Sequence, residues 1–389
     1  MLPWEACLPR FHLPRRLATA RFISAGDMPL TEDLAAWLKL SLTPGLGSEG
    51  LRRLLADFGG PEPILAASRA ALARHVGDSV AAAIKQAGTD AALAAVAAWL
   101  EDPANHVVTL ADAAYPAQLL QIPDPPLLLY VKGRVELLSH PSVAIVGSRN
   151  ASAQGSANAE AFARTLSEAG LTVVSGLALG IDAAAHRGGL AGASGSVAVL
   201  GTGADIVYPA RNRALAHELA ARGALVTEYP LGMSPLPGNF PRRNRVISGL
   251  ALGCLVVEAA TDSGSLITAR LAAEQGREVF AIPGSIHSPL AKGCHALIKQ
   301  GAKLVESAND ILEELKLQAP PPPASADITV PDSLAQRLLD ALGHDPCDLG
   351  TLAARCGFTA AETAALLTQL ELDGCVAVLP GGLYQRLQR

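Results

Sequence analysis

Three consecutive residues, Gly147, Ser148 and Arg149, follow an apolar run in the segment VAIVGSR and could together hold an anion. Glycine lets a backbone amide approach a ligand closely, serine adds a hydroxyl donor, and arginine can bind a phosphate through two hydrogen bonds. A turn that binds a dinucleotide would carry the pattern G-x-G-x-x-G at this place. Because this segment has a single glycine, it predicts a site for one phosphate, and NAD chemistry is not expected.

Two other turns between an apolar run and a helical stretch are equally polar. They contain Ser175, Gly176 and Gly180 in VVSGLALGIDAAAH, and Ser263, Gly264 and Ser265 in VEAATDSGSLITA. Free amides at such turns and at helix N-termini favour negative charge. One turn alone says little, because strand-to-helix turns need glycine anyway. Several on one edge of a sheet, with an arginine among them, predict phosphate binding.

A third cluster is basic and aromatic. It comprises Phe240, Arg242, Arg243, Asn244 and Arg245 in NFPRRNRVISG, with Arg211 and Arg213 upstream in YPARNR. Guanidinium groups pair with phosphates, and an aromatic ring can stack on an unpaired base. Arginines in the first turn of a helix oppose its dipole, so the run predicts an anionic partner. The alternative is a helix whose arginines are merely solvated.

Catalytic signals are weak in this sequence. Asp182 and His186 lie four residues apart on one expected helix and could pair as acid and base. We favour instead an N-cap aspartate and a histidine packed against a loop, and we assign both, with Thr268, to a structural or polar lining of the pocket. The sequence has no nucleophile with an evident base, no metal-binding motif and no P-loop. We therefore expect no catalytic residues, no metal and no cofactor.

Composition narrows the class of protein. A formal net charge of −5 argues against a generally basic coat for nucleic acid, although a local basic site stays compatible with it. None of the six cysteines forms a C-x-x-C pair, so a zinc ribbon is unexpected. The longest uncharged stretches are broken by glycines and fall short of the ~20 apolar residues of a membrane span. No signal peptide is visible, and we expect a cytoplasmic protein.

Short apolar runs alternate with stretches long enough for a helix between residues 107 and 316. The runs expected as strands are VVTL, PLLLYV, SVAIVG, LTVVSG, SVAVLG, ALVTEY, CLVVEA and EVFAIPG, with AKLVE as a further candidate. This alternation indicates a mainly parallel sheet with helices on both faces. The expected fold class is α/β, with a doubly wound, Rossmann-like core that binds ligands at the carboxyl ends of its strands.

Helical spacing dominates residues 31–101, before the first expected strand. The segment LTPGLGSEGLRRLLADFGG predicts a helix-hairpin-helix unit of the SAM-like kind, with Gly45 and Gly47 in the turn and Arg52 and Arg53 on the second helix. Amides at the start of that helix could face a DNA phosphate. We favour the alternative, in which the hairpin only packs two helices together.

A small module is expected after a proline-rich stretch, APPPPAS. Three helical segments, SLAQRLLDAL, DLGTLAARCG and TAAETAALLTQLELDG, precede a two-stranded wing in CVAVLPGGLYQRL, which indicates a winged helix. The third helix, which usually reads a DNA groove, carries Glu362, Glu371 and Asp373 and no Lys or Arg. Phosphates would repel these acids, so we favour contact with protein over contact with DNA.

The expected domain organisation has five parts. These are an extension (1–27), a helix-hairpin-helix domain (28–102), the Rossmann-like core (103–316), a proline-rich linker (317–332) and the winged helix (333–389). The extension could be a transit peptide. We favour Met28 as the true start, because Thr31 can cap a helix that has acids in its first turn.

Six segments resemble the DNA-processing protein A (DprA/Smf) family in order and spacing. They are VAIVGSR, VVSGLALGIDAAAH, VAVLGTGADIVYP, NFPRRNRVISGL, VVEAATDSGSLITARLAAEQGREVFAIPG and LIKQGA, across about 110 to 310. The flanking helix-hairpin-helix and winged-helix modules resemble those of the family's longer members. By this resemblance, the family's Gly-Ser-Arg phosphate pocket corresponds to Gly147, Ser148 and Arg149, and its F-P-x-R-N-R segment to Phe240, Pro241, Arg243, Asn244 and Arg245.

The resemblance also implies a function. A member of this family would bind single-stranded DNA in the bacterial cytoplasm and help to load the recombinase RecA during natural transformation and recombination. It would work as a homodimer, without catalytic turnover, metal or small-molecule substrate. Two departures concern the outer edge of the DNA groove. Asp262 stands where many members have Lys or Arg before S-G-S, and Ala210 followed by Arg211 stands where many have Lys after Y-P.

Two other functions are weighed against this one. The first is a nucleotide-hydrolysing enzyme, similar to the phosphoribohydrolases of the same Rossmann-like superfamily. Those enzymes carry P-G-G-x-G-T-x-x-E where this chain has EAATDSGSLITA, without the tandem glycines and the glutamate. The second is a scaffold that binds RecA through a chain whose anion pocket is vestigial. Single-stranded DNA binding remains the favoured prediction.

Overall fold

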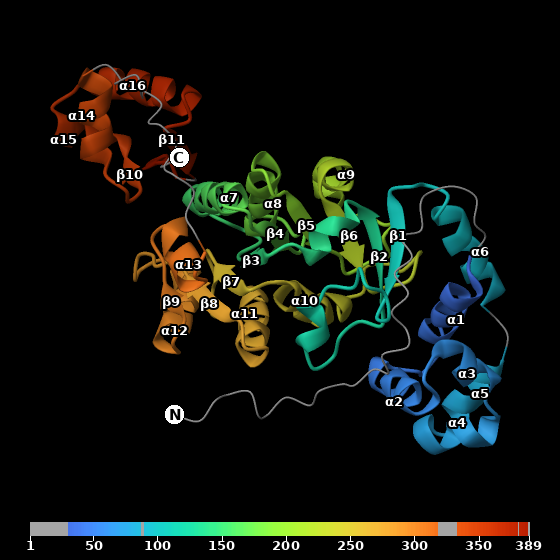
Figure 1. Cartoon of the computed structure of the whole chain (residues 1–389). Coiled ribbons are helices and arrows are strands. Elements are labelled where there is room, and N and C mark those ends of the chain that lie inside the picture. The colour runs from blue at the N-terminus through green and yellow to red at the C-terminus, as the bar shows by residue number, and fades with distance from the viewer. Residues whose placement is uncertain (1–29, 87–88, 318–332, 380, 388–389) are drawn as a thin grey trace.

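The computed structural model describes residues 30–86, 89–317, 333–379 and 381–387, and Figure 1 shows three units along them. A helical unit comes first, a large sheet with helices on both faces follows, and a small mixed module ends the chain. The expected extension, 1–27, lies outside the described residues, as does the expected linker, 317–332, apart from Leu317. The boundaries predicted between the units remain predictions.

The helical unit begins with the expected helix-hairpin-helix. Its helices are α1 (Glu32–Ser41), α2 (Ser48–Phe58), α3 (Pro61–Ala66), α4 (Arg69–Val76), α5 (Asp78–Lys85) and α6 (Asp90–Trp99). Thr31 caps α1 as predicted, because its hydroxyl accepts a hydrogen bond from the Leu34 amide at 3.3 Å. In the turn before α2, Gly45 has a φ of +78°, which few other residues adopt without strain.

Apolar and ionic contacts join the helical unit to the sheet. Leu38 of α1 and Val96 of α6 belong to a buried cluster that also contains Leu128 and Tyr130 of the sheet. Arg52 of α2 donates a hydrogen bond to the Asp124 carboxylate at 2.9 Å. Arg53 lies 3.8 Å from Glu49 on the same helix. The hairpin therefore packs against the core, and both of its arginines already have an anionic partner within the chain.

The central sheet has nine strands in the order β1-β2-β6-β5-β4-β3-β7-β8-β9. They are β1 (Asn105–Thr109), β2 (Leu128–Gly133), β3 (Ser142–Val146), β4 (Thr172–Ser175), β5 (Ser196–Val199), β6 (Ala224–Thr227), β7 (Gly253–Val256), β8 (Glu278–Ala281) and β9 (Lys303–Leu304). The strands from β6 to β9 in this order are parallel, whereas β1 and β2 add antiparallel pairs at one edge. The predicted α/β doubly wound fold is confirmed.

Helices cover both faces of this sheet (Figure 1). One face packs α7 (Ala153–Glu168), α8 (Ile181–Ala191), α9 (Arg213–Arg222) and α13 (Ala308–Glu314). The other face packs α10 (Asn239–Leu250), α11 (Ser265–Glu274) and α12 (Lys292–Lys299). The chain leaves β3 for β4 on one side and later returns to β7 on the other, so β3 and β7 form the topological switch point, where such sheets bind ligands.

The C-terminal module is a winged helix, as predicted. It contains α14 (Ser333–Leu342), β10 (Cys347–Asp348), α15 (Leu349–Cys356), α16 (Ala360–Leu372), β11 (Val376–Leu379) and β12 (Leu383–Arg386). The wing is the antiparallel pair of β11 and β12, and β10 adds a third strand. Glu362 completes a capping box with Thr359 at the start of α16, so this acid has a structural role.

No helix in the described ranges combines the length and the apolar character needed to traverse a bilayer.

Asp124 should stabilise the contact between the helical unit and the sheet. It lies between two guanidinium groups, accepting from Arg52 at 2.9 Å and from Arg245 Nε at 3.2 Å. Burial alone would raise its pKa, but Arg245 and Arg52 hold the pKa of Asp124 below its usual range. We expect Asp124→Asn to lower the free energy of unfolding by about 1 kcal/mol near neutral pH, measured by thermal denaturation.

Because the pKa of Asp124 is lowered in the folded chain, the stabilisation that Asp124 provides depends on pH. The stabilisation is complete above the pKa near 4 of an unfolded aspartate, and it disappears as the pH falls through the lower folded value. The difference between wild type and Asp124→Asn should therefore shrink on acidification. Asp262→Asn, at an exposed aspartate of the same domain, is the control. Equal stability of wild type and Asp124→Asn at neutral pH would contradict the role given to Asp124.

Candidate nucleic-acid interface

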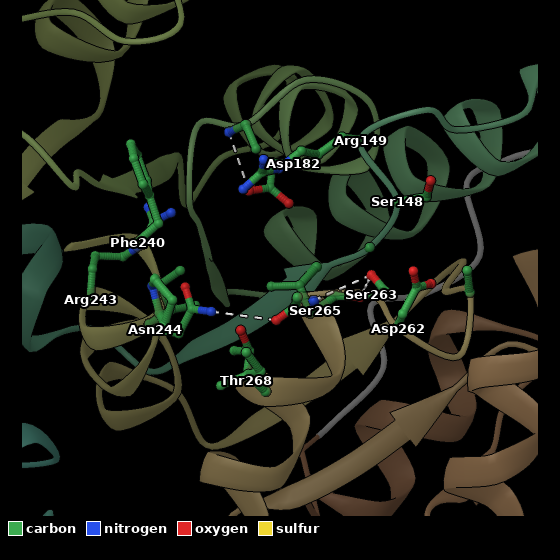
Figure 2. Close-up of a pocket in the computed structure, with 18 of the residues that line it drawn as sticks. Ser148, Arg149, Asp182, Phe240, Arg243, Asn244, Asp262, Ser263, Ser265 and Thr268 are labelled. Carbon is green, nitrogen blue, oxygen red and sulfur yellow. Dashed lines mark hydrogen bonds between the residues drawn. The ribbon is translucent and has the colours of Figure 1, made fainter. Parts of the chain in front are cut away.

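A pocket of about 680 Å³ opens at the switch point between β3 and β7. Its lining comes from the loops after β3, β4 and β7 and from α10, and includes Gly147, Ser148, Arg149, Asp182, Phe240, Arg243, Asn244, Ser263, Gly264, Ser265 and Thr268. Figure 2 shows Arg149 and Asp182 across the pocket from Ser265 and Thr268, with the residues of α10 along a third side. The sequence therefore predicted most of the residues that meet here.

Arg149 is the exposed cation of this pocket. Its guanidinium has no hydrogen-bond or ion-pair partner within the part of the chain that the structure describes. The loop beneath it is fixed, because the Ser148 amide donates to Glu258 O at 2.7 Å and the Ile181 amide donates to Ser148 O at 3.1 Å. A Cβ at Gly147 would lie 2.6 Å from Ile181 Cγ1, so only glycine lets this loop pack so closely. The fold thus presents Arg149 from a rigid base.

Asp182 occupies the amides of the turn after β4. Its Oδ2 accepts from the amides of Gly176 at 3.1 Å and Ala178 at 3.3 Å. The N-cap of α8 is Gly180, so the predicted N-cap role of Asp182 is wrong. The Ser175 hydroxyl is also engaged, since it donates to Ile145 O at 2.6 Å. The expectation that this turn offers free amides and a free hydroxyl is therefore corrected.

Gly180 has a packing role in the same turn. Its φ is +73°, and a Cβ there would lie 2.7 Å from Arg149 O. The glycine lets the start of α8 approach the loop that carries Arg149.

His186 is a packed, neutral histidine. Its Nε2 accepts from the Leu177 amide at 3.2 Å, and its Nδ1 lies 2.7 Å from Ser196 Oγ. Burial, assisted by the charges of Arg243 and Arg187, lowers the pKa of His186 to about 3. Both ring nitrogens contact groups other than Asp182, so this geometry offers no acid–base pair, and the histidine packs against the loop after β4.

Arg243 is a buried arginine at the wall of the pocket, with only 5% of its surface exposed. Its Nη1 donates to Gly176 O at 2.8 Å and to Val199 O, which ties α10 to the ends of β4 and β5. Burial lowers the pKa of Arg243 to about 10, and the charge of Asp182 works against that shift. Its Nε is buried without a hydrogen-bond partner, so one donor of this side chain remains unmatched.

Arg245 points away from the pocket and is 8% exposed. Its guanidinium binds Glu228 at 2.8 Å and Asp124 at 3.2 Å. Arg242 is more exposed and lies 3.7 Å from Glu228. Since α10 begins at Asn239, Arg243 and Arg245 lie beyond its first turn. The argument that this run requires an external anion is therefore wrong, because Glu228, Asp124 and Asp182 supply the negative charge.

Two aromatic rings form one rim of the pocket. Phe240 and Tyr208 lie with ring centroids 5.4 Å apart at an interplanar angle of 40°, and Tyr208 is 48% exposed. A Cβ at Gly201 would lie 2.8 Å from Phe240 Cδ1, so this glycine makes room for the ring. Sequence reasoning missed Tyr208 as a site residue, although its aromatic type within YPARNR was a usable signal.

Arg211 lies outside the lining of the pocket. It belongs to the short 3-10 helix Ala210–Asn212 and is exposed.

The N-terminus of α11 faces the pocket, and its N-cap residue, Gly264, has no side chain to cap it. The Ser263 hydroxyl accepts instead from the Ser265 amide at 3.3 Å and lies 2.7 Å from the Ser265 hydroxyl. Asn244 reaches this turn weakly, with Nδ2 3.5 Å from Gly264 O (Figure 2). Such a helix end, with hydroxyl donors at hand, favours an anion. Asp262 is exposed at the same rim and opposes that preference.

The assembled chemistry is that of a binding site. It combines an exposed guanidinium, a helix N-terminus, hydroxyls and two aromatic rings around one pocket. Among the described residues, no group of three or more His, Cys, Asp or Glu side chains could hold a metal ion. The arrangement suits a phosphate and an unpaired base.

Comparison with protein families agrees with this geometry. A family model for DNA recombination-mediator protein A matches residues 106–316, which is more than half of the chain. The chain belongs to the DNA recombination-mediator protein A family. A second model, for the DprA winged helix domain, matches residues 318–382. The resemblance to the DprA/Smf family is confirmed.

Individual DprA relatives match over most of their length. Protein Smf of Escherichia coli (strain K12) is 45% identical over 302 residues, which are 75% of this chain and 80% of that protein. The X-ray structure of DNA processing protein A from Streptococcus pneumoniae has a TM-score of 0.63 and 39% identity, and covers 74% of this chain and 99% of its own. The Helicobacter pylori protein has a TM-score of 0.50 and 29% identity, over 54% and 96%. Its structure is described as giving insights into a unique single-stranded DNA binding mode.

His186 should stay neutral across the physiological range. Because its pKa is lowered to about 3, the unfolded chain takes up a proton below an ordinary histidine pKa of ~6.5 while the folded chain does not. This difference reduces stability as the pH falls from about 6.5 towards 3. We expect the His186 ring resonance in NMR spectra, assigned by its loss in His186→Gln, to remain constant between about pH 8 and pH 5. A resonance that titrates in that interval would contradict the burial assigned to His186.

Proposed function

We propose that this chain binds single-stranded DNA through the switch-point pocket and acts as a recombination mediator. In this proposal it helps to load RecA onto single strands in the cytoplasm during natural transformation and recombination, as a homodimer. It does so without catalytic turnover, metal or cofactor.

The observation that carries the proposal is the pocket of about 680 Å³ in which the exposed Arg149, the N-terminus of α11 and the Phe240–Tyr208 pair meet. Guanidinium and helix amides bind backbone phosphates, and stacking on rings accepts any base. Single-stranded DNA offers both groups side by side, whereas a duplex keeps its bases stacked inside. The related Helicobacter pylori protein, described by its single-stranded DNA binding mode, adds support.

The proposed contacts are fewer than the sequence predicted. They are Gly147, Ser148, Arg149, Tyr208, Phe240, Asn244, Ser263, Gly264 and Ser265, with Arg243 contributing through its unmatched Nε and Thr268 lining the wall. Ser175, Gly176, Gly180 and Arg245 are assigned to support, because the chain itself uses their polar groups or their shape. Arg211 and Arg242 are exposed and could meet DNA further along its track.

The proposal that the chain catalyses no reaction is based on the chemistry of the pocket. Asp182 and His186, the residues closest to an acid–base pair, are both engaged by backbone amides. An enzyme that releases ribose phosphate from nucleotides would need a carboxylate or nucleophile activated by a neighbouring group, whereas the exposed Asp262 at the rim has no side-chain hydrogen bond to another described residue.

The contact with RecA and the homodimer are proposed because the chain belongs to this family. No interface residues are assigned to either contact. For the winged helix, the acids Glu371 and Asp373 near the end of α16 favour contact with protein over contact with DNA.

Arg149→Ala should weaken binding of a short single-stranded oligonucleotide by roughly 10- to 100-fold. One charge-assisted phosphate contact contributes about 1.5–3 kcal/mol, and each 1.4 kcal/mol is tenfold in affinity. Fluorescence anisotropy over a range of salt concentrations measures both the affinity and its salt dependence. The slope of log K against log salt should become shallower by about 0.7 for each phosphate that the variant no longer neutralises.

The control is Arg164→Ala, which removes an exposed arginine near the far end of α7. It should bind like the wild type, and duplex DNA should bind much more weakly than single strands to every variant. Unchanged affinity of Arg149→Ala, or equal affinity for single and double strands, would refute the proposal.

Asp262→Lys should tighten binding of the same oligonucleotide several-fold. It removes a carboxylate that repels phosphates at the rim of the pocket and adds a cation there, which should steepen the salt slope by about 0.7. Asp262→Asn separates the two effects, because it removes the repulsion alone and should give a smaller gain. If neither variant binds more tightly than the wild type, the DNA does not pass the start of α11.

A further inference from the structure

The N-terminus of α7 lies at the switch point, directly after β3 and the Gly147–Arg149 turn. In sheets that bind dinucleotides, the helix after the first strand receives the pyrophosphate at this place. Its amides and its dipole attract negative charge there. In the present chain, a side chain from another strand already occupies the position.

The Glu258 carboxylate is bound to Ser152, the N-cap residue of α7. Oε2 accepts from the Ser152 amide at 2.9 Å, and Oε1 accepts from the Ser152 hydroxyl at 2.5 Å. The same hydroxyl accepts from the Gly155 amide at 2.9 Å. A Cβ at Gly155 would overlap this carboxylate, so the glycine leaves the space that Glu258 fills. The carboxylate thus lies at the N-terminus of α7, where the helix dipole favours an anion.

Strand pairing brings Glu258 to this place. β3 and β7 are parallel neighbours, with Val146 opposite Val256, so Glu258 follows the end of β7 as Ser148 follows the end of β3. The Ser148 amide donates to Glu258 O at 2.7 Å, which fixes the two loops against one another. Glu258 therefore reaches from the end of β7 to the N-cap residue of α7, next to the pocket but outside its lining.

We propose that Glu258 determines specificity by acting as an internal anion at the switch point, at the N-terminus of α7. Its carboxylate excludes the phosphate of a free 5′-mononucleotide and the pyrophosphate of a dinucleotide from the N-terminus of α7. Arg149 and the N-terminus of α11 remain for the internal phosphates of a polymer. The polymer half of this statement rests on the proposed function, whereas the exclusion of nucleotides does not depend on it.

A structural cap alone would predict a different result. If Glu258 only stabilised α7, its removal would lower stability and leave ligand binding unchanged. If it excludes an anion, its removal opens a position that phosphate can enter. A gain of binding distinguishes the two roles, because a merely weakened fold does not acquire a ligand.

The experiment compares wild type with Glu258→Ala, using AMP and inorganic phosphate as the probes. Calorimetry should show no saturable AMP binding by the wild type. Glu258→Ala should bind AMP saturably, at least about tenfold more tightly than the weakest affinity that the measurement can detect. Phosphate should raise the melting temperature of Glu258→Ala and leave that of the wild type unchanged. The control Glu274→Ala, at an exposed glutamate of α11, should behave as the wild type. A folded Glu258→Ala that gains neither AMP nor phosphate overturns the proposal.

Glu258→Gln keeps the test decisive if Glu258→Ala fails to fold. Glutamine preserves the volume and can keep both contacts with Ser152 while it removes the charge. We expect its melting temperature to fall by roughly 2–4 °C, since the helix N-terminus loses its anion, and to rise again when phosphate is added. A structural cap alone would not give that response, so a folded Glu258→Gln whose melting temperature does not respond to phosphate overturns the proposal. Failure of the wild type to bind single-stranded DNA would refute the proposed function and leave these results interpretable.

Discussion

The electrostatic potential at the carboxyl edge of the sheet is positive, and negative charge has to balance it. Helices α7, α8 and α11 all begin there, and each helix end is equivalent to about half a positive charge. The chain places a carboxylate at two of these starts itself, with Glu258 at the N-cap of α7 and Asp182 on the amides before α8. At α11 the N-cap is Gly264, which has no side chain, and the first amide is bound by the neutral hydroxyl of Ser263. Among these three helix starts, α11 is therefore the one whose amides bind no carboxylate of the described residues, and Arg149 lies across the pocket from it (Figure 2).

The arginines of α10 explain why this arrangement is rigid. Arg243 is tied to the ends of β4 and β5, and it faces the buried Asp182 charge that holds the turn between them. Arg245 is tied to Glu228 and to Asp124, and Asp124 in turn holds Arg52 of the helical unit. A buried charge without a partner costs several kcal/mol. Each of these arginines therefore stabilises the one arrangement of neighbouring groups in which its charge is paired. The helix that presents Phe240 and Asn244 to the pocket is thus anchored through its buried face, and the exposed groups are free to bind.

The sequence predicted the fold class and most pocket residues, because both depend on local signals. Alternating apolar runs identify strands, and polar turns after parallel strands must meet at one edge. The antiparallel placement of β1 and β2 depends on long-range pairing and was not predicted. The sequence likewise does not predict which acceptor each hydrogen-bond donor meets in the fold. Arg149 and Arg245 are the same residue type in two equally polar segments. One is exposed, whereas the other is paired with Asp124, 121 residues away in the chain. Amides that the sequence predicted to be free are engaged within the chain. Asp182 occupies those of Gly176 and Ala178, and the carbonyl of Glu258, which follows a strand that is not consecutive in sequence, accepts from that of Ser148.

A pocket with so little unmatched positive charge constrains how the chain could bind a polymer. The net charge of −5 provides no general attraction for DNA, and the exposed Asp262 weakens the local one. In the proposed function, a few phosphate contacts would give a modest affinity that salt reduces, so base stacking on Phe240 and Tyr208 would have to supply part of the binding energy, at about 1–3 kcal/mol per base. Stacking tolerates any sequence, which suits a protein that must accept whatever strand is present. Two such pockets in the proposed homodimer would engage one strand together. The second contact would then form at the high effective concentration set by the first, which turns two weak sites into one strong one.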